Sequence, residues 1–246
     1  YAFLEKTNLY KPLRIKNEYY QKVDLSWHYM GNKKIINSIK SKISKKKFSK
    51  EIIHFTKKKY ICLFIKNFSL KNKNNDLFFQ IRQTRNLDKI YKLIKFLNRK
   101  KINILILGTE RDHFIKLLPE KIKKLDNICL FKDLSKNYSI EDQAIVALKS
   151  KGYIGSNSGA NGFFGLLLKK HLIIDDAIYP THKNWQNFNF LYKRIYNKKT
   201  KKIEFLNREK LLNNNQYILN YKSSDYQIIE NSYSQIKNKT LKTFNL

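Results

Sequence analysis

The 246-residue sequence is poor in the residues that mark several common classes of protein. Its two cysteines, Cys62 and Cys129, are too few for a disulfide scaffold of this length. Seven glycines and three prolines exclude a collagen-like or other Gly/Pro-rich chain. No apolar run reaches the roughly 18 residues that indicate a membrane-spanning helix. The five histidines lack metal-ligand spacing, and Asp175-Asp176 lacks the Asp-x-Asp pattern, so we expect neither a metal nor a cofactor.

Acidic residues and arginine are scarce as well. The 51 Lys and Arg residues outnumber the 19 Asp and Glu, which gives a formal net charge of +32. Such a charge suggests nucleic acid or an anionic membrane surface as a partner. Only seven of the 51 are arginine, the residue that reads guanine edges and clamps phosphates. Because Lys, Asn, Ile, Phe and Tyr all have A/T-rich codons, we attribute most of the excess to coding background, and nucleic acid is not the partner we expect.

The densest basic segment covers residues 31–59, where eleven lysines face one acid, Glu51. Four isoleucines recur there at helical spacing, at positions 35, 36, 39 and 43. We therefore predict a basic amphipathic helix, followed by a second short helical turn from Ser49. Such a helix can lie on anionic lipid. The alternative, which we favour, is an ordinary helix with a solvated lysine face.

From residue 60 onward, short apolar runs alternate with segments of helical periodicity. Hydrophobic residues make up 42% of the chain and aromatic residues 14%, which is enough to bury a core. This alternation predicts an α/β fold, a Rossmann-like parallel sheet with helices on both faces and helical flanks. We expect strands at 60–65, 102–107, 127–131, 152–154 and 171–174, and helices at 87–99, 111–124, 139–149 and after a Gly-rich turn up to Lys169.

The same pattern divides the chain into three regions. Residues 1–58 are expected to be a linker or helical remnant of an upstream domain, because the chain begins at Tyr1 rather than Met. Residues 59–184 form the expected Rossmann-like domain. Residues 185–246 are expected to form a helical tail packed on that domain, with a hairpin around 197–202 and helices near 207–219 and 225–239.

The most informative segment is the turn that follows the predicted strand 152–154. It reads Tyr-Ile-Gly-Ser-Asn-Ser-Gly-Ala-Asn-Gly over residues 153–162 and opens a helix. Ligands of parallel sheets bind at the carboxyl ends of strands, and free N–H groups at a helix start attract phosphate. Ser156 and Ser158 add hydroxyl donors. The alternative is a tight βα turn whose glycines only allow close packing. A hydrolase nucleophile elbow is disfavoured, because Asn157 stands where its serine would be.

Two further segments are expected at the same edge of the sheet. Gly108-Thr109-Glu110 ends a strand, and Glu110 could bind a ribose or act as a base; the alternative is a polar start of the next helix. Arg82 and Arg85 lie just before the first long helix, where a fixed guanidinium could bind a diphosphate. The alternative there is an exposed pair of loop arginines.

The order of these motifs resembles a family of bacterial glycosyltransferases of surface-polysaccharide synthesis, whose nucleotide-sugar domain is GT-B-like. The resemblance covers roughly residues 55–215 and implies that the chain is the C-terminal half of a GT-B-like fold. The segments that carry it follow the family's order: Tyr60-Ile61-Cys62-Leu63, Thr84-Arg85-Asn86-Leu87-Asp88, Ile104-Leu105-Ile106-Leu107-Gly108, Asp142, Tyr153-Ile154-Gly155-Ser156-Asn157-Ser158-Gly159 and Lys193-Arg194-Ile195-Tyr196-Asn197-Lys198-Lys199.

The resemblance also implies an activity. The chain would transfer a sugar from a nucleotide-diphosphate donor to a cell-surface glycan or lipid-linked acceptor. It would work in the cytoplasm, with a peripheral contact to the anionic inner face of the membrane as a further option. The residues implied are Lys66, Arg85, Ser156, Asn157, Ser158 and Gly159 for the donor diphosphate, Gly108, Thr109 and Asp142 for the nucleoside, and Arg85 and Glu110 for catalysis.

The sequence departs from the family in one place. Where the family has His-x-Arg-Glu/Asp, this chain has Phe64-Ile65-Lys66-Asn67, so the histidine and the acid are absent and lysine replaces arginine. Lysine keeps the charge but loses the bidentate fork. Lys66 could still hold phosphate, or the chain could be a non-catalytic relative that binds a nucleotide sugar or a glycan. An RNA-binding basic protein is a third hypothesis, which no recognition motif supports.

Overall fold

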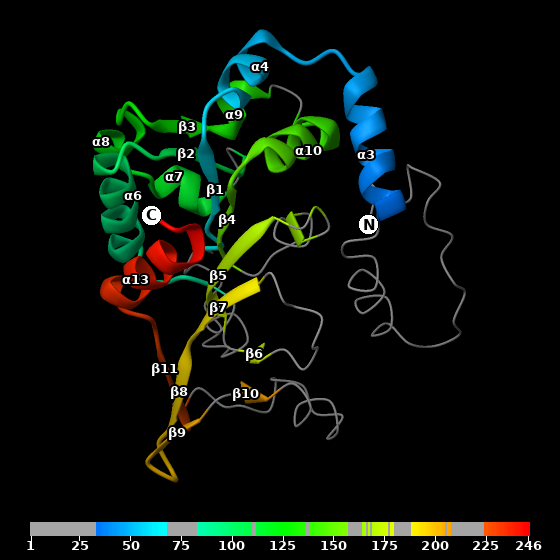
Figure 1. Cartoon of the computed structure of the whole chain (residues 1–246). Helices are drawn as coiled ribbons and strands as arrows, with labels where there is room; N and C mark the ends of the chain where they lie inside the picture. Colours follow the sequence, from blue (N-terminus) through cyan, green and yellow to red (C-terminus); the bar gives the residue numbers. More distant parts are fainter. Residues whose placement is uncertain are drawn as a thin grey trace.

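The computed structural model has at its centre a six-stranded sheet with helices on both faces (Figure 1). The order of the strands is β3-β2-β1-β4-β5-β7, and every neighbouring pair is parallel. The expected α/β fold class is therefore confirmed. The structure describes residues 33–67, 83–109, 112–135, 138–156, 164, 165, 167, 169–176, 178–179, 188–204, 206–207 and 224–246.

The strands are short and apolar, because a parallel sheet that is covered on both faces buries nearly every side chain. Along β1, Tyr60 and Cys62 face one apolar cluster, whereas Ile61 and Leu63 face the other, as the two-residue period of a strand requires. The strand bounds are β1 Tyr60–Phe64, β2 Asn103–Ile106, β3 Ile128–Leu130, β4 Gly152–Gly155, β5 Lys170–Asp176 and β7 Phe188–Tyr192.

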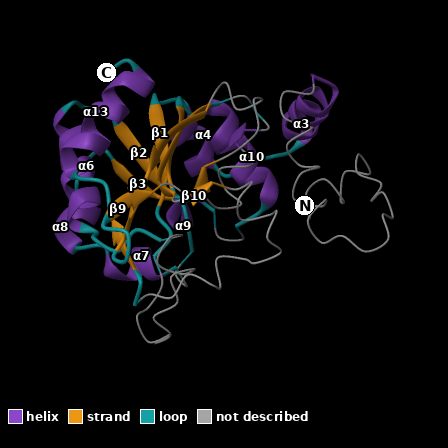
Figure 2. Ribbon diagram, turned by 90° about the horizontal axis from the view of Figure 1, so that it is seen from below, coloured by secondary structure: helices purple, strands orange, loops and turns teal. Residues whose placement is uncertain are grey.

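The helices form two layers, one on each face of the sheet (Figure 2). One layer contains α6 (Asp88–Arg99), α7 (His113–Leu117), α8 (Glu120–Lys123) and the C-terminal α13 (Tyr233–Phe244). The other contains α3 (Lys33–Lys45), α4 (Lys50–Thr56), α9 (Phe131–Leu134) and α10 (Ile140–Lys149). None of the helices in the described part of the chain is long and apolar enough to span a bilayer.

The basic helix expected near the N-terminus is confirmed as α3, and the turn from Ser49 as α4. Ile39 and Ile43 of α3 are buried in the same cluster as α10, whereas Lys40 and Lys42 are exposed. The apolar side of α3 thus packs on the protein, as the ordinary-helix interpretation requires. The hydroxyl of Ser49 caps α4 by accepting the N–H of Ile52.

Two helix predictions were wrong in their extent. The helix expected over 111–124 is two short helices, because Leu118, which precedes Pro119, takes an extended conformation with ψ of 117°. A residue before proline avoids the helical region, so the chain breaks there. The helix expected near 225–239 begins only at Tyr233, after a strand β11 (Tyr226–Ile229) that pairs with β8.

The region beyond residue 184 contains more strand than expected. The sixth strand of the sheet, β7, comes from it, and the predicted hairpin is confirmed as β8 (Arg194–Asn197) and β9 (Lys202–Glu204). A small parallel pair joins β6 (Ile178–Tyr179) to β10 (Leu206–Asn207). Helix α13 returns to pack on β5, β7 and α6, so the end of the described chain completes the first helical layer.

Candidate functional site

The site region is defined by the point where the strand order reverses, between β1 and β4. From β1 the chain proceeds outward to β2 and β3, and then crosses to β4, β5 and β7. Connections on either side of such a point diverge, which leaves a crevice at the carboxyl ends of the strands. Lys66 follows β1 at this edge and Ser156 follows β4, so the fold brings these two sequence-predicted residues together.

Gly155 allows the close approach of β1 and β4 at this point. A Cβ atom on Gly155 would collide with the carbonyl of Phe64 and lie 2.8 Å from Tyr153 Oη. The strand register places Phe64 opposite Gly155. A side chain at position 155 would therefore separate the two strands at the crevice, which explains why glycine stands there.

Ser156 ties the two strand ends together. Its N–H donates to the carbonyl of Phe64 at 2.9 Å, and its Oγ accepts the N–H of Lys66 at 2.9 Å. Its own carbonyl accepts the hydroxyl of Tyr153 at 2.9 Å. Ser156 is only 2% exposed. Its hydroxyl thus holds the backbone of Lys66 in place, a positioning role that the sequence did not suggest.

A pocket of about 110 Å³ lies beside the crevice, at the ends of β1 and β2. Four of its lining residues are aromatic, and a few polar groups lie just after β2 and on α10. It is smaller than the roughly 300–1,000 Å³ of a site for a whole small-molecule ligand, so it suits one ring of a larger ligand. The lining residues are Phe64, Leu107, Gly108, Thr109, Phe131, Tyr138, Gln143, Val146 and Phe164.

Gly108 and Thr109 line this pocket because of a tight turn after β2. Gly108 has φ of +125°, which a residue with a side chain rarely adopts. The carboxylate of Asp112 accepts the N–H of Thr109 at 2.6 Å and its hydroxyl at 3.1 Å. The Asp112 side chain therefore fixes the turn, and two of the three residues predicted for the nucleoside, Gly108 and Thr109, line the pocket.

Asp142 lies in the first turn of α10, close in sequence to the pocket residues Tyr138 and Gln143. Its carboxylate accepts the hydroxyl of Ser135 at 2.7 Å and lies 3.6 Å from the ammonium of Lys46. The N–H of Asp142 donates to Ser139 Oγ, so Ser139 caps α10 at the predicted start of the helix. These contacts orient the Asp142 side chain, and its role toward a nucleoside stays a prediction.

The backbone around Lys66 is held by a second set of contacts. The carbonyl of Lys66 accepts the N–H of Thr84 at 2.9 Å, and Asn67 Nδ2 donates to the carbonyl of Thr84 at 2.6 Å. This bond orients the amide so that Asn67 Oδ1 meets His113 Nδ1 at 2.6 Å. An amide oxygen only accepts, so Nδ1 of His113 carries the proton. The segment after β1 is thus fixed from both sides of the crevice.

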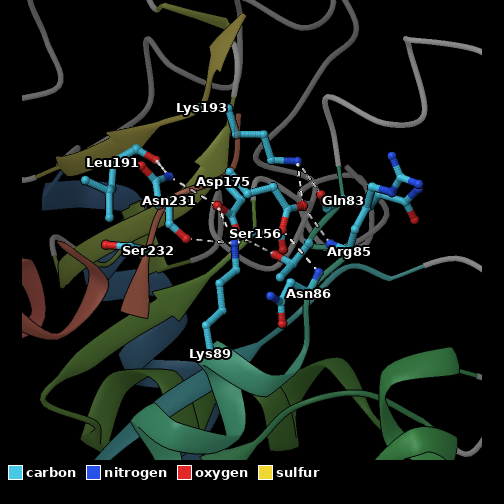
Figure 3. Close-up of polar contacts among 12 residues, drawn as sticks. Gln83, Arg85, Asn86, Lys89, Ser156, Asp175, Leu191, Lys193, Asn231 and Ser232 are labelled. Atoms are coloured by element: carbon cyan, nitrogen blue, oxygen red, sulfur yellow. Dashed lines mark hydrogen bonds and ion pairs between the residues drawn. The ribbon is translucent and has the colours of Figure 1, made fainter. Parts of the chain in front are cut away.

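A network of buried charges supports this segment from the end of β5 (Figure 3). Asp175 has a fully buried carboxylate and φ of +57°, and it lies 2.9 Å from the ammonium of Lys89. The hydroxyl of Thr84 and the amide of Asn231 also donate to it, at 2.9 and 3.1 Å. Because Thr84 also binds Lys66, the network is linked to the crevice.

Glu230 completes the network. It lies 3.0 Å from the ammonium of Lys89 and 3.6 Å from that of Lys193, whose Nζ also donates to the carbonyl of Gln83. Burial raises the pKa of Glu230, but Lys89, the backbone N–H of Arg85 and Lys193 together hold that pKa below its ordinary value.

Arg85 lies at the rim of this network. Its backbone N–H donates to Glu230 at 2.8 Å, and that of Asn86 donates to the same carboxylate at 3.1 Å. The residue is exposed, and in Figure 3 its guanidinium points away from the buried carboxylates. The arginine is thus anchored through its main chain, and its contact with a diphosphate stays a prediction.

Several predicted residues lie outside the described part of the chain. They are Arg82, Glu110, Asn157, Ser158 and Gly159. Within the described residues, no group of three or more His, Cys, Asp and Glu side chains is arranged to hold a metal ion.

Sequence reasoning missed the buried charge network. One signal was available: Lys89 stands on the same face of α6 as Leu93 and Leu97, four and eight residues on, and both leucines are buried. A lysine on an apolar stripe indicates a buried partner. Glu230 gave no such signal, because its contacts are with residues about 40 to 145 positions away along the chain.

No protein-family model matches the sequence, and no curated protein matches it either. Among solved structures, the chain is similar to ADP-heptose LPS heptosyltransferase II of E. coli, with 10% identity, a TM-score of 0.44 and coverage of 81% of this chain and 53% of that one. It is also similar to a family 9 glycosyl transferase of Veillonella parvula, with 9% identity, a TM-score of 0.46 and coverage of 81% and 53%.

A third similarity is to the UDP-GlcNAc 2-epimerase of Methanocaldococcus jannaschii, solved with UDP-GlcNAc and UDP. It has 11% identity, a TM-score of 0.39 and coverage of 84% of this chain and 51% of that one. The chain thus spans about half the length of these structures.

Proposed function

We propose that this chain is the donor-binding half of a glycosyltransferase and that it binds a nucleotide-diphosphate sugar at the crevice between β1 and β4. One observation carries the proposal: the strand order reverses there, and Lys66, held by Ser156, and the aromatic pocket lie at the same edge. A lysine beside the backbone of a strand end suits phosphate, and a small aromatic pocket suits one flat ring.

The residues then take distinct roles. Gly108 and Thr109 contact the nucleoside in the pocket, and Asp142 contacts its ribose. Lys66 and Arg85 neutralise the diphosphate as it leaves, which is electrostatic stabilisation of departing charge. Asn157, Ser158 and Gly159 hold it with uncharged hydrogen-bond donors. Glu110 serves as the base or as a ribose ligand. The acceptor is a cell-surface glycan or a lipid-linked glycan, and the chain works at the cytoplasmic side of the membrane.

Isothermal titration with ADP, UDP, GDP and dTDP tests donor binding. We expect at least one of them to bind. Lys66→Gln should weaken that binding about 10- to 100-fold, the size of a lost hydrogen bond to a charged group. Lys92→Gln, which removes an equal charge from the exposed side of α6, is the matched control and should bind as the wild type does. Failure of all four nucleotides to bind would overturn the proposal.

A non-catalytic relative that holds a nucleotide sugar is the second candidate. It is favoured by Phe64-Ile65-Lys66-Asn67, which has neither histidine nor acid. The two candidates differ in turnover. A glycosyltransferase releases or transfers sugar from a bound donor, and the rate falls in Arg85→Ala and Ser158→Ala. A binding module holds the donor without consuming it.

A further inference from the structure

The two edges of the central sheet carry very different charge. The carboxyl edge, which holds the crevice, also holds Asp88, Asp112, Asp133, Glu141, Asp142, Asp175 and Glu230 among its described residues. The turns that lead into the amino ends of β1 to β5 hold a single acid in their described residues, Asp126. The lysines there are 57, 58, 59, 100, 101, 124, 151 and 169, with 170 as the first residue of β5.

These lysines form one surface, which we call the amino-edge surface and define by the exposed lysines 57, 58, 59, 100, 101, 124, 151 and 170. They come from five separate turns, but parallel strands bring the starts of all five to the same edge. The surface is therefore a product of the fold. Along the sequence its lysines spread from 57 to 170 and do not form one basic run.

Neither coding background nor helix ends explains this distribution. A coding bias toward lysine would act along the whole chain and would not leave the described turns before β1 to β5 with a single acid. The helix dipole favours lysine in the last turn of a helix, and its effect fades within that turn. Lys58, Lys59, Lys101, Lys151 and Lys170 lie beyond the helix ends.

The chemistry of the amino-edge surface suits an anionic lipid surface. Its described turns are dominated by lysine, with Arg99 beside them at the end of α6, and they contain no aromatic residue, so they lack the groups that stack on nucleic acid bases. Lysine presents a point charge that meets phosphate without a fixed geometry. The surface also lies at the opposite end of the strands from the crevice, so it is separate from the proposed donor site.

We propose that the amino-edge surface docks the protein on anionic phospholipid. The proposal places the membrane contact at the turns before β1 to β5 rather than on α3, whose Ile39 and Ile43 are buried in the core. It does not depend on nucleotide binding. Each lysine that lies near the lipid surface tightens association about fivefold, and the docking weakens as the salt concentration rises.

Vesicle sedimentation tests this proposal with the whole chain. Vesicles of phosphatidylglycerol and phosphatidylcholine should bind the protein, and vesicles of phosphatidylcholine alone should not. The edge variant changes one lysine in each of four turns: Lys58→Gln, Lys100→Gln, Lys124→Gln and Lys151→Gln. The matched control removes the same charge from exposed sites elsewhere: Lys92→Gln, Lys116→Gln, Lys198→Gln and Lys202→Gln.

We expect the edge variant to bind anionic vesicles at least about tenfold more weakly than the control variant. Equal losses in the two variants would overturn the proposal, because net charge alone would then explain the binding. So would the absence of binding to anionic vesicles. Tighter binding to single-stranded RNA than to vesicles, lost in the edge variant, would also overturn it and would assign the surface to nucleic acid.

A second measurement uses the unmodified protein and does not depend on the folding of any variant. Lysines are reductively methylated with and without anionic vesicles and then quantified by mass spectrometry. The proposal predicts protection of Lys58, Lys100, Lys124 and Lys151, and unchanged labelling of Lys92 and Lys202. Uniform protection of all exposed lysines, or protection confined to α3, would contradict it.

Discussion

At the scale of single residues, the fold keeps four charged side chains out of solvent or nearly so: Lys89, Asp175, Lys193 and Glu230. Such a cluster adds little net stability when complete, because desolvation offsets the attraction between the charges. The contribution of the cluster is to hold neighbouring segments in place. Through Thr84 it fixes the backbone of Lys66, so the segment after β1 cannot shift without breaking buried ion pairs.

Removal of one partner tests this residue-scale argument. Lys89→Met leaves the carboxylate of Asp175 buried beside an apolar group, and breaking a buried pair in this way costs about 3–5 kcal/mol. We expect urea unfolding to show a loss of that size. Lys92 lies three residues further along α6 and is exposed, so Lys92→Met should change the free energy of unfolding by less than about 0.5 kcal/mol. Equal losses in the two variants would mean that the pair is not buried as described.

At the scale of elements, local sequence sets where the helices begin and end. Ser49, Ser139 and Ser232 each accept a backbone N–H of the following turn, at the start of α4, α10 and α13. In α13 the cap is reciprocal, because Gln235 also accepts the N–H of Ser232. Helix α13 then packs on β5 and α6, so its cap also anchors the end of the described chain on the sheet.

The cap of α13 gives an element-scale prediction. Ser232→Ala removes one half of the capping box and should lower the free energy of unfolding by about 1 kcal/mol. Ser234→Ala, two residues further on and exposed, is the matched control and should have little effect. Thermal unfolding of the two variants under the same conditions makes the comparison. A Ser232→Ala variant as stable as Ser234→Ala would show that the box contributes nothing.

At the scale of the whole molecule, charge is sorted by edge. The lysines gather where the strands begin, and the acids gather where the strands end and where the ion pairs lie. A chain with a formal charge of +32 repels itself, so each carboxylate that stays ionised helps to keep the fold together.

Acid should destabilise the whole fold for this reason. The pKa values of Glu230 and Glu141 are held below their ordinary value of 4.5 in the folded protein. A lowered folded pKa contributes stability above pH 4.5, and that stability is lost as pH falls through the folded pKa. Urea unfolding between pH 7 and pH 3 should show a decline below about pH 4.5 that is smaller in Glu230→Gln than in the wild type. An equal decline in both would assign the acid sensitivity to other carboxylates.

The sequence alone determined the βα alternation, the parallel sheet and the helix starts at Ser49 and Ser139. These depend on periodicity and on local hydrogen bonding, which neighbouring residues fix among themselves. The break at Pro119 was also local, yet the helical spacing around it concealed it.

Only the tertiary structure decided the rest. It placed Lys66 against Ser156, 90 residues apart, and Lys89 against Glu230, 141 residues apart, because partners at such separations are chosen by the strand order and by burial. It brought lysines from five turns onto one surface and buried Ile39 and Ile43 of α3 in the core. The physical reason is the same in each case: the contacts and the burial of a charge or an apolar face depend on the residues that the folded chain places next to it.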